Sequence, residues 1–195
     1  MEPFDPTRPR EALVHQLSHH MQRWGYLEDP APPAALRWID TFIEAFGAQL
    51  SDFEQARPLL ADLRAESCTI PALELERLRS REALFFLDAV AQYVDHESEL
   101  RGLPLDHDIP AIGEEFGLSR ADALHVVRMA LTGRAAGPPL ELLFPLLGHD
   151  RILIRVGAVN SRLLHGRGLE PIAFGPDGKP FEPIHGRRPQ EPEEA

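Results

Sequence analysis

The residues best suited to chemistry in this sequence are arginines beside a proline-containing loop. Arg128 precedes a Thr-Gly pair, Arg134 follows it, and Pro138 and Leu140 come a few residues later. An arginine guanidinium pairs with phosphate oxygens in bidentate fashion or stacks on an unpaired base. Apolar loop residues can support a splayed base, as recognition of single-stranded RNA usually requires. These residue types permit a nucleic-acid contact at this loop.

The charge distribution singles out the same stretch. Residues 120–168 hold seven arginines against three carboxylates, whereas the whole chain has a net charge of −11. Such a net charge argues against general affinity for a polyanion and favours a local site. An alternative is a solvated helix face without a ligand. In that case Arg151 and Arg155 pair with Asp150 or Glu141.

Other reactive side chains form weaker patterns. His15 and His19 are four residues apart, with Glu11 one turn earlier, which is a spacing that could place three metal ligands on one helix face. A solvated polar face is the simpler interpretation, and His20 is expected to be a core histidine. No local motif supports a catalytic pair between Cys68 and a histidine. We expect neither a metal nor a cofactor.

Composition places the chain among ordinary globular proteins. Of its 195 residues, 43% are hydrophobic and 26% are charged, and no apolar run approaches the roughly 20 residues that span a bilayer. The acidic N-terminus does not resemble a signal peptide. One cysteine excludes an intrachain disulfide. We expect a cytoplasmic protein.

Apolar periodicity of 3.6 residues predicts an all-α fold. A capping-box pattern at Ser51–Glu54 starts one helix, which Pro58 should kink or shorten, and Ser119 and Gly133 bound another. The full set of predicted helices covers residues 10–27, 36–50, 51 onward, 71–96, 109–116, 120–131, 138–147 and 150–164. Residues 101–108 are predicted to form a loop. Residues 172–181 suggest a small hairpin about a Pro-Asp-Gly turn, within a tail that begins at residue 167.

Residues 127–155 carry a resemblance to a known family. They contain VRMALTGR, then GPPL, then LLGHDRILIR. This order is similar to the C-terminal signature of glutamyl-tRNA synthetases: an arginine, a hydrophobic–Ala-Leu-Thr-Gly turn, a proline loop, a Leu-Gly turn and an arginine-containing helix. The resemblance spans about residues 10–160. It implies a two-part helical cage that grips the anticodon stem-loop of tRNA-Glu. It also implies that Arg128, Pro138 and Leu140 contact anticodon bases.

Two positions depart from the family pattern, and the catalytic motifs of a synthetase are absent. Gly137 stands where the family often has Thr or Ser, and Phe46 stands where some synthetases have an arginine. The sequence contains no His-Ile-Gly-His motif after a strand pattern. Lys179 is its single lysine, which excludes a two-lysine Lys-Met-Ser-Lys-Ser loop. We therefore expect a non-catalytic protein.

These observations lead to one leading interpretation. The chain is expected to be a stand-alone tRNA-binding module, auxiliary or regulatory to aminoacylation of tRNA-Glu, with Arg128, Arg134, Pro138 and Leu140 as RNA contacts. The alternative is a helical protein-interaction module that kept the fold and lost RNA, with a partner such as a synthetase. We predict an N-terminal arm over 1–9, helical subdomains over 10–70 and 71–166, and a tail over 167–195.

Overall fold

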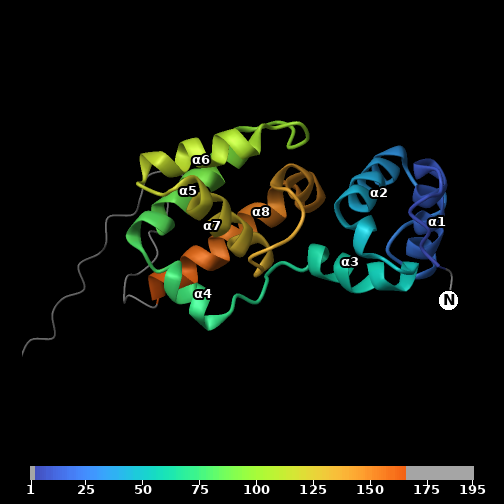
Figure 1. The fold of residues 1–195 in the computed structure, drawn as a ribbon, viewed down its shortest axis with the longest axis horizontal. Coiled ribbons are helices and arrows are strands. Elements are labelled where there is room, and N and C mark those ends of the chain that lie inside the picture. The colour runs from blue at the N-terminus through green and yellow to red at the C-terminus, as the bar shows by residue number, and fades with distance from the viewer. Residues whose placement is uncertain (1–2, 166–195) are drawn as a thin grey trace, which may run out of the picture.

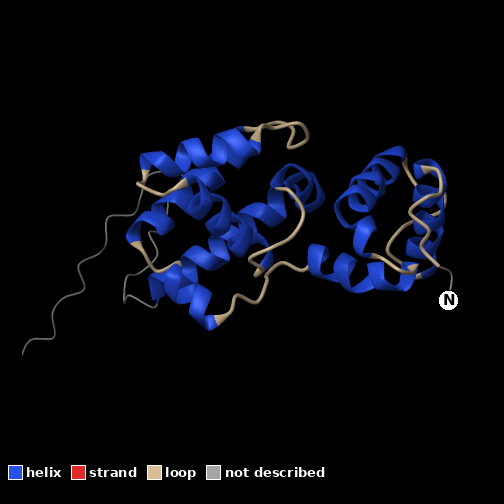
Figure 2. Ribbon diagram, viewed as in Figure 1, coloured by secondary structure: helices blue, strands red, loops and turns tan. Residues whose placement is uncertain are grey.

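The computed structural model describes residues 3–165, and its regular elements over that range are helices. The α-helices are α1 (Arg10–Arg23), α2 (Pro33–Phe46), α3 (Ala56–Arg64), α4 (Ala72–Arg77), α5 (Arg81–His96), α6 (Leu105–Glu115), α7 (Arg120–Thr132) and α8 (Leu140–His165). Two short 3₁₀ helices, Gly47–Gln49 and Phe53–Gln55, join α2 to α3. Figure 2 shows this helical fold, which confirms the all-α prediction. The predicted hairpin and tail lie outside the described residues.

The helices gather at two ends of the molecule. Figure 1 shows α1, α2 and α3 at one end and α4 to α8 at the other, with the first part of α8 close to α2. The linker between α3 and α4 contains the boundary predicted near residue 70, and the division into two subdomains stays a prediction. Fully buried phenylalanines occur at both ends: Phe42, Phe53, Phe86 and Phe144. They belong to one continuous hydrophobic core.

Local sequence signals explain most helix boundaries. The Ser119 hydroxyl accepts a hydrogen bond from the backbone N–H of Asp122 at 3.2 Å and so caps α7. Gly133 ends the same helix in the left-handed conformation, with φ of 67°. Gly148, with φ of 73° and ψ of 166°, breaks α8 into two helical parts, as predicted for a helix ending there. The loop 133–139 therefore connects the defined end of α7 to the start of α8.

Several boundaries differ from the sequence-based expectation, and the structure shows a cause for three of them. Asp52, rather than Ser51, caps the 3₁₀ helix before α3, because its Oδ1 accepts from the Gln55 N–H at 3.1 Å. The predicted helix 71–96 is interrupted, since Ser80 accepts from the Ala83 N–H at 3.0 Å and starts α5 anew. Helix α6 begins at residue 105, inside the predicted loop. Its Leu105, Ile109 and Pro110 are all buried, and their combined packing stabilises the helix despite the hydrogen bond lost at Pro110.

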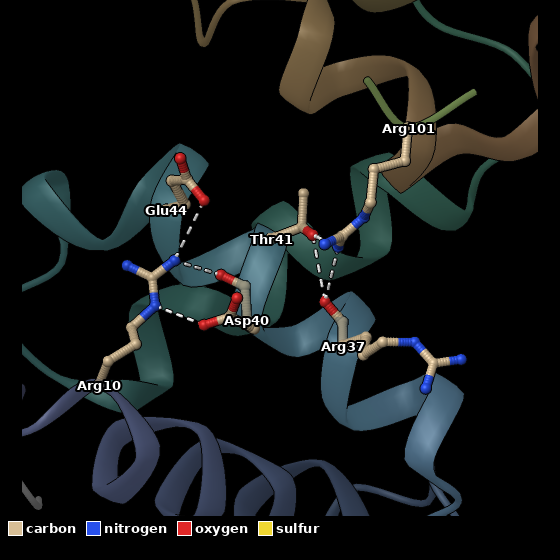
Figure 3. Close-up of polar contacts among 6 residues, drawn as sticks. All are labelled: Arg10, Arg37, Asp40, Thr41, Glu44 and Arg101. Carbon is tan, nitrogen blue, oxygen red and sulfur yellow. Dashed lines mark hydrogen bonds and ion pairs between the residues drawn. The ribbon is translucent and has the colours of Figure 1, made fainter. Parts of the chain in front are cut away.

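Polar contacts hold α2 from both ends of the molecule (Figure 3). Arg10 of α1 donates to the Asp40 carboxylate at 2.7 Å and lies 3.5 Å from Glu44. Arg101, in the loop between α5 and α6, donates to the Thr41 hydroxyl and, at 3.2 Å, to the Arg37 carbonyl. The loop before α6 is thereby tied to the opposite group of helices.

A second tie lies within the α4–α8 group. The Tyr93 hydroxyl on α5 donates to the Asp108 carboxylate on α6 at 2.7 Å, and His107 Nδ1 lies 3.0 Å from the other oxygen. The contact with His107, followed by that with Tyr93, lowers the pKa of Asp108. The carboxylate therefore joins α5 to the first turn of α6.

Candidate nucleic-acid interface

The loop between α7 and α8 begins at a glycine that no other residue can replace without strain. Gly133 has φ of 67°, and a Cβ built on it would lie 2.2 Å from the Thr69 carbonyl oxygen. The linker 65–71 therefore packs backbone against backbone at the end of α7. This contact makes the linker and the loop 133–139 two neighbouring walls of one site.

A cavity of about 380 Å³ opens between these walls and α3. Its lining includes Arg134, Gly137 and Pro138 from the loop, and Ser67, Cys68 and Thr69 from the linker. Asp62 of α3 and Arg155 of α8 contribute the charged groups of the remaining wall. Burial raises the pKa of the Cys68 thiol, which keeps it protonated and unreactive at neutral pH. The cavity mixes apolar surface with a few polar groups, as ligand sites usually do.

Arg134 and Pro138, two of the four predicted contact residues, line this cavity. Arg134 is exposed, and its Nη2 lies 2.7 Å from Asp62 Oδ2. Both side chains of this ion pair are about 60% exposed, at 59% and 62%. Exposed pairs of this kind stabilise a fold by at most about 1 kcal/mol. Breaking this ion pair would therefore cost the fold little stability.

Arg128 and Leu140 lie beneath the loop rather than on its surface. The half-buried guanidinium of Arg128 donates from Nη1 to the Pro138 carbonyl, and a Cβ on Gly137 would lie 3.5 Å from this nitrogen. Burial lowers the pKa of Arg128. Leu140 is only 2% exposed and belongs to the core. In this conformation both residues fix the shape of the loop, and their predicted contact with RNA stays a prediction.

Arg155 has a structural role beside the cavity that sequence reasoning missed. The alternative of a solvated helix face would pair it with Asp150 or Glu141, but its guanidinium is directed into the interior, and the residue is 3% exposed. It donates to the carbonyls of Leu63 and Ala65 near the end of α3, and to that of Leu131 at the end of α7. The sequence did contain a signal of this burial, because Arg155 lies on the same helix face as Ile152, Val156 and Val159, which are apolar.

Buried Arg155 joins the two groups of helices at the site. The carbonyls at a helix C-terminus have no partners within the helix and carry partial negative charge. One guanidinium bonds to such carbonyls on α3 and α7 together and so links these two helices beside the cavity. Burial lowers the pKa of Arg155, although arginine remains protonated in proteins.

The remaining candidates from the sequence lie away from this cavity. Over the described residues, no cluster of three or more His, Cys, Asp or Glu side chains is arranged to hold a metal ion, so the His15–His19 pattern is not assembled into a site. His20 is 5% exposed and stacks on Phe53, with ring centroids 4.9 Å apart, as expected of a core histidine. None of the helices between residues 3 and 165 is both long and apolar enough to cross a membrane.

The comparison with protein families decides how this helical arrangement is classified. The family described as "Anticodon binding domain" matches residues 37–159, from α2 to the second part of α8. The chain belongs to this anticodon-binding domain family. The matched range contains the four predicted contact residues and Arg155.

Known relatives of this anticodon-binding domain are glutamate–tRNA ligases. The chain is 24% identical over 151 residues to "Glutamate--tRNA ligase 2" of Caldanaerobacter subterraneus, covering 77% of the chain and 31% of that protein. It is 26% identical over 159 residues to the ligase of Desulforudis audaxviator, covering 76% and 30%. A third, from Methylacidiphilum infernorum, is 30% identical over 106 residues, covering 53% and 22%. The chain thus spans about 30% of the first two relatives.

Proposed function

We propose that this anticodon-binding domain binds transfer RNA, with tRNA-Glu as the expected ligand, and contributes recognition rather than catalysis. The observation that carries the proposal is the position of the loop 133–139. It lies within the family match and forms one wall of a cavity that also presents the exposed Arg134. The single lysine of the sequence and the lack of a nucleotide-binding motif support a non-catalytic role.

The geometry suggests how a single-stranded loop of RNA would be held. A phosphate binds Arg134 in place of Asp62, and an unpaired base enters the adjoining cavity against Pro138. Arg128 holds the Pro138 carbonyl from beneath, so the loop is shaped before the RNA arrives. Such preorganisation lowers the entropic cost of binding.

A gel-shift assay at low salt tests this proposal with tRNA-Glu and a size-matched random RNA. Arg134→Ala is expected to weaken binding of tRNA-Glu by about three- to tenfold, because one phosphate contact is lost. Arg120→Ala is the matched control, since Arg120 is also exposed and ion-paired, at 3.0 Å to Asp106, but does not line the cavity. Equal affinity for both RNAs, or equal effects of both substitutions, would contradict the proposal.

The ion pairs favour a specific alternative, a protein-interaction module that no longer binds RNA. Arg120 and Arg134, two exposed arginines of the basic stretch, are already paired with carboxylates. Their positive charge is therefore partly neutralised before any ligand binds. A pull-down with the purified chain, analysed for RNA and protein, separates the two functions: recovery of a synthetase without tRNA supports this alternative.

A further inference from the structure

A second cavity, of about 220 Å³, lies where three helices of one group meet α8. It shares Leu63 with the first cavity, but its other walls come from the end of α1, the first half of α2 and the middle of α8. Aliphatic side chains form much of its lining. The aromatic and charged side chains that line it are Tyr26, Trp38, Arg64 and Arg151.

Among the described residues, neither arginine of this cavity forms an ion pair with a carboxylate. No Asp or Glu lines the cavity. Within the part of the chain that the structure describes, Arg64 donates only to the Tyr26 carbonyl, at 3.3 Å. Arg151 donates to the carbonyls of Arg64 and Leu147, at 3.4 and 3.3 Å. By contrast, Arg10, Arg120 and Arg134 are paired with carboxylates. The cavity is thus a local positive site in an acidic protein.

The aromatic rings of the cavity are held in fixed orientations. Trp38 donates its indole N–H to the Leu146 carbonyl at 3.0 Å and stacks on Phe42, with an interplanar angle of 16°. The guanidinium of Arg64 lies over the Tyr26 ring, 5.1 Å from its centroid. A ring whose polar atom is already bonded offers its π surface to a ligand at little entropic cost.

We propose that this cavity binds a nucleotide, with the base stacked on Trp38 and the phosphate held by Arg64 and Arg151. Planar guanidinium groups match phosphate oxygens, and bases stack on aromatic side chains without regard to sequence. The combination of two unbalanced arginines and a partly exposed indole fits this ligand class better than a simple anion. A nucleotide of bound RNA and a free mononucleotide share the chemistry. Binding of an RNA nucleotide at this cavity rests on the proposed function, whereas binding of a free mononucleotide does not.

Intrinsic fluorescence of the full chain tests the proposal. The sequence has two tryptophans, so Trp24→Phe leaves Trp38 as the reporter. Adenosine monophosphate and a short single-stranded oligoribonucleotide are titrated separately, with ribose 5-phosphate as the ligand without a base. At least one of the two base-containing ligands is expected to quench Trp38 saturably, and ribose 5-phosphate is not. In that background, Arg64→Gln and Arg151→Gln are each expected to weaken binding about tenfold.

The matched control is Arg81→Gln. Arg81 also lies over an aromatic ring, 5.3 Å from the centroid of Phe85, but it does not line the cavity. It should leave quenching unchanged, and circular dichroism checks that each variant folds. Saturation by the oligonucleotide alone assigns the site to RNA, and saturation by adenosine monophosphate assigns it to a free nucleotide. No saturable quenching, or quenching that survives both pocket substitutions, would overturn the proposal.

The two proposals fail independently in these assays. If tRNA-Glu binds in the gel shift while Trp38 shows no quenching, the loop 133–139 remains the RNA site and the second cavity is excluded. If adenosine monophosphate quenches Trp38 while tRNA-Glu does not bind, the second cavity remains a nucleotide site and the proposed function fails.

Discussion

Replacing Arg155 with methionine should destabilise the domain more than any change at an exposed arginine. Methionine keeps much of the side-chain volume but removes every donor. The carbonyls of Leu63 and Leu131 then lose their guanidinium partner at buried positions. The carbonyls of Asp62 and Ala65, which are both exposed residues, can instead be hydrated. The expected loss therefore depends mainly on the two buried carbonyls.

Each buried carbonyl left without a partner costs about 1–3 kcal/mol, which gives about 2–6 kcal/mol for the pair. Methionine offsets part of this loss, because it removes the cost of keeping a charged guanidinium away from water. The same burial lowers the pKa of Arg155. We expect a net loss of about 2–4 kcal/mol. Arg155→Lys should fall between methionine and wild type, since an ammonium cannot reach the ends of α3 and α7 together.

Urea unfolding followed by circular dichroism measures this loss. Arg162→Met is the matched control on the same helix, since Arg162 is exposed and should change stability by less than about 0.5 kcal/mol. Because Arg155 joins the two groups of helices, its loss should also broaden the transition and lower the m-value. If Arg155→Met remained within about 0.5 kcal/mol of wild type, the guanidinium could not be what joins α3 to α7.

Three further outcomes follow from the same contacts. Gly133→Ala should lower the free energy of unfolding in urea by at least about 2 kcal/mol. Gly117 also has positive φ but open space around it, so Gly117→Ala should lower it by about 1–2 kcal/mol. Equal losses would refute the close contact between Gly133 and the Thr69 carbonyl. Asp62→Asn should raise affinity for tRNA-Glu about two- to fivefold in a low-salt gel shift, and an unchanged affinity would mean that this carboxylate does not compete with phosphate. Asp108, whose folded pKa is lowered, stabilises the fold above its unfolded value of 3.8, and this stabilisation disappears as pH falls through the folded pKa. Acid titration of Asp108→Asn should therefore show a shallower loss of stability below pH 3.8, and an unaltered profile would exclude the effect.

Local signals in the sequence were enough for the fold class and for most helices. Ser119 and Gly133 bound α7 as predicted, because a cap and a left-handed glycine act through neighbouring backbone atoms. The errors arose where tertiary packing decides. Leu105 starts α6 because its side chain enters the core, and the sequence alone does not show that the core reaches it. The break before α5 depends on a cap at Ser80 within an otherwise helical pattern.

The candidate site was only partly predictable for a related reason. The sequence placed arginines near one loop, and Arg134 does line the cavity with Pro138. Whether an arginine faces solvent or the interior depends on partners distant in sequence. Arg155 bonds to Leu63, 92 residues away, and Arg134 pairs with Asp62, 72 residues away. The amino-acid composition does not distinguish these arginines. Only the fold shows which of them are exposed and which are buried.

This separation explains how the two proposed sites for a polyanion are compatible with an acidic domain. At physiological ionic strength, charges more than about 8 Å apart in solvent are largely screened, so carboxylates elsewhere on the surface weaken a local site only modestly. The first cavity offers Arg134 opposite a displaceable carboxylate, and the second offers Arg64 and Arg151 without one. At low ionic strength, where screening is weaker, the net charge of −11 slows the approach of RNA and disfavours non-specific binding. Binding should therefore depend on a few placed contacts, which favours a selective ligand over a general one.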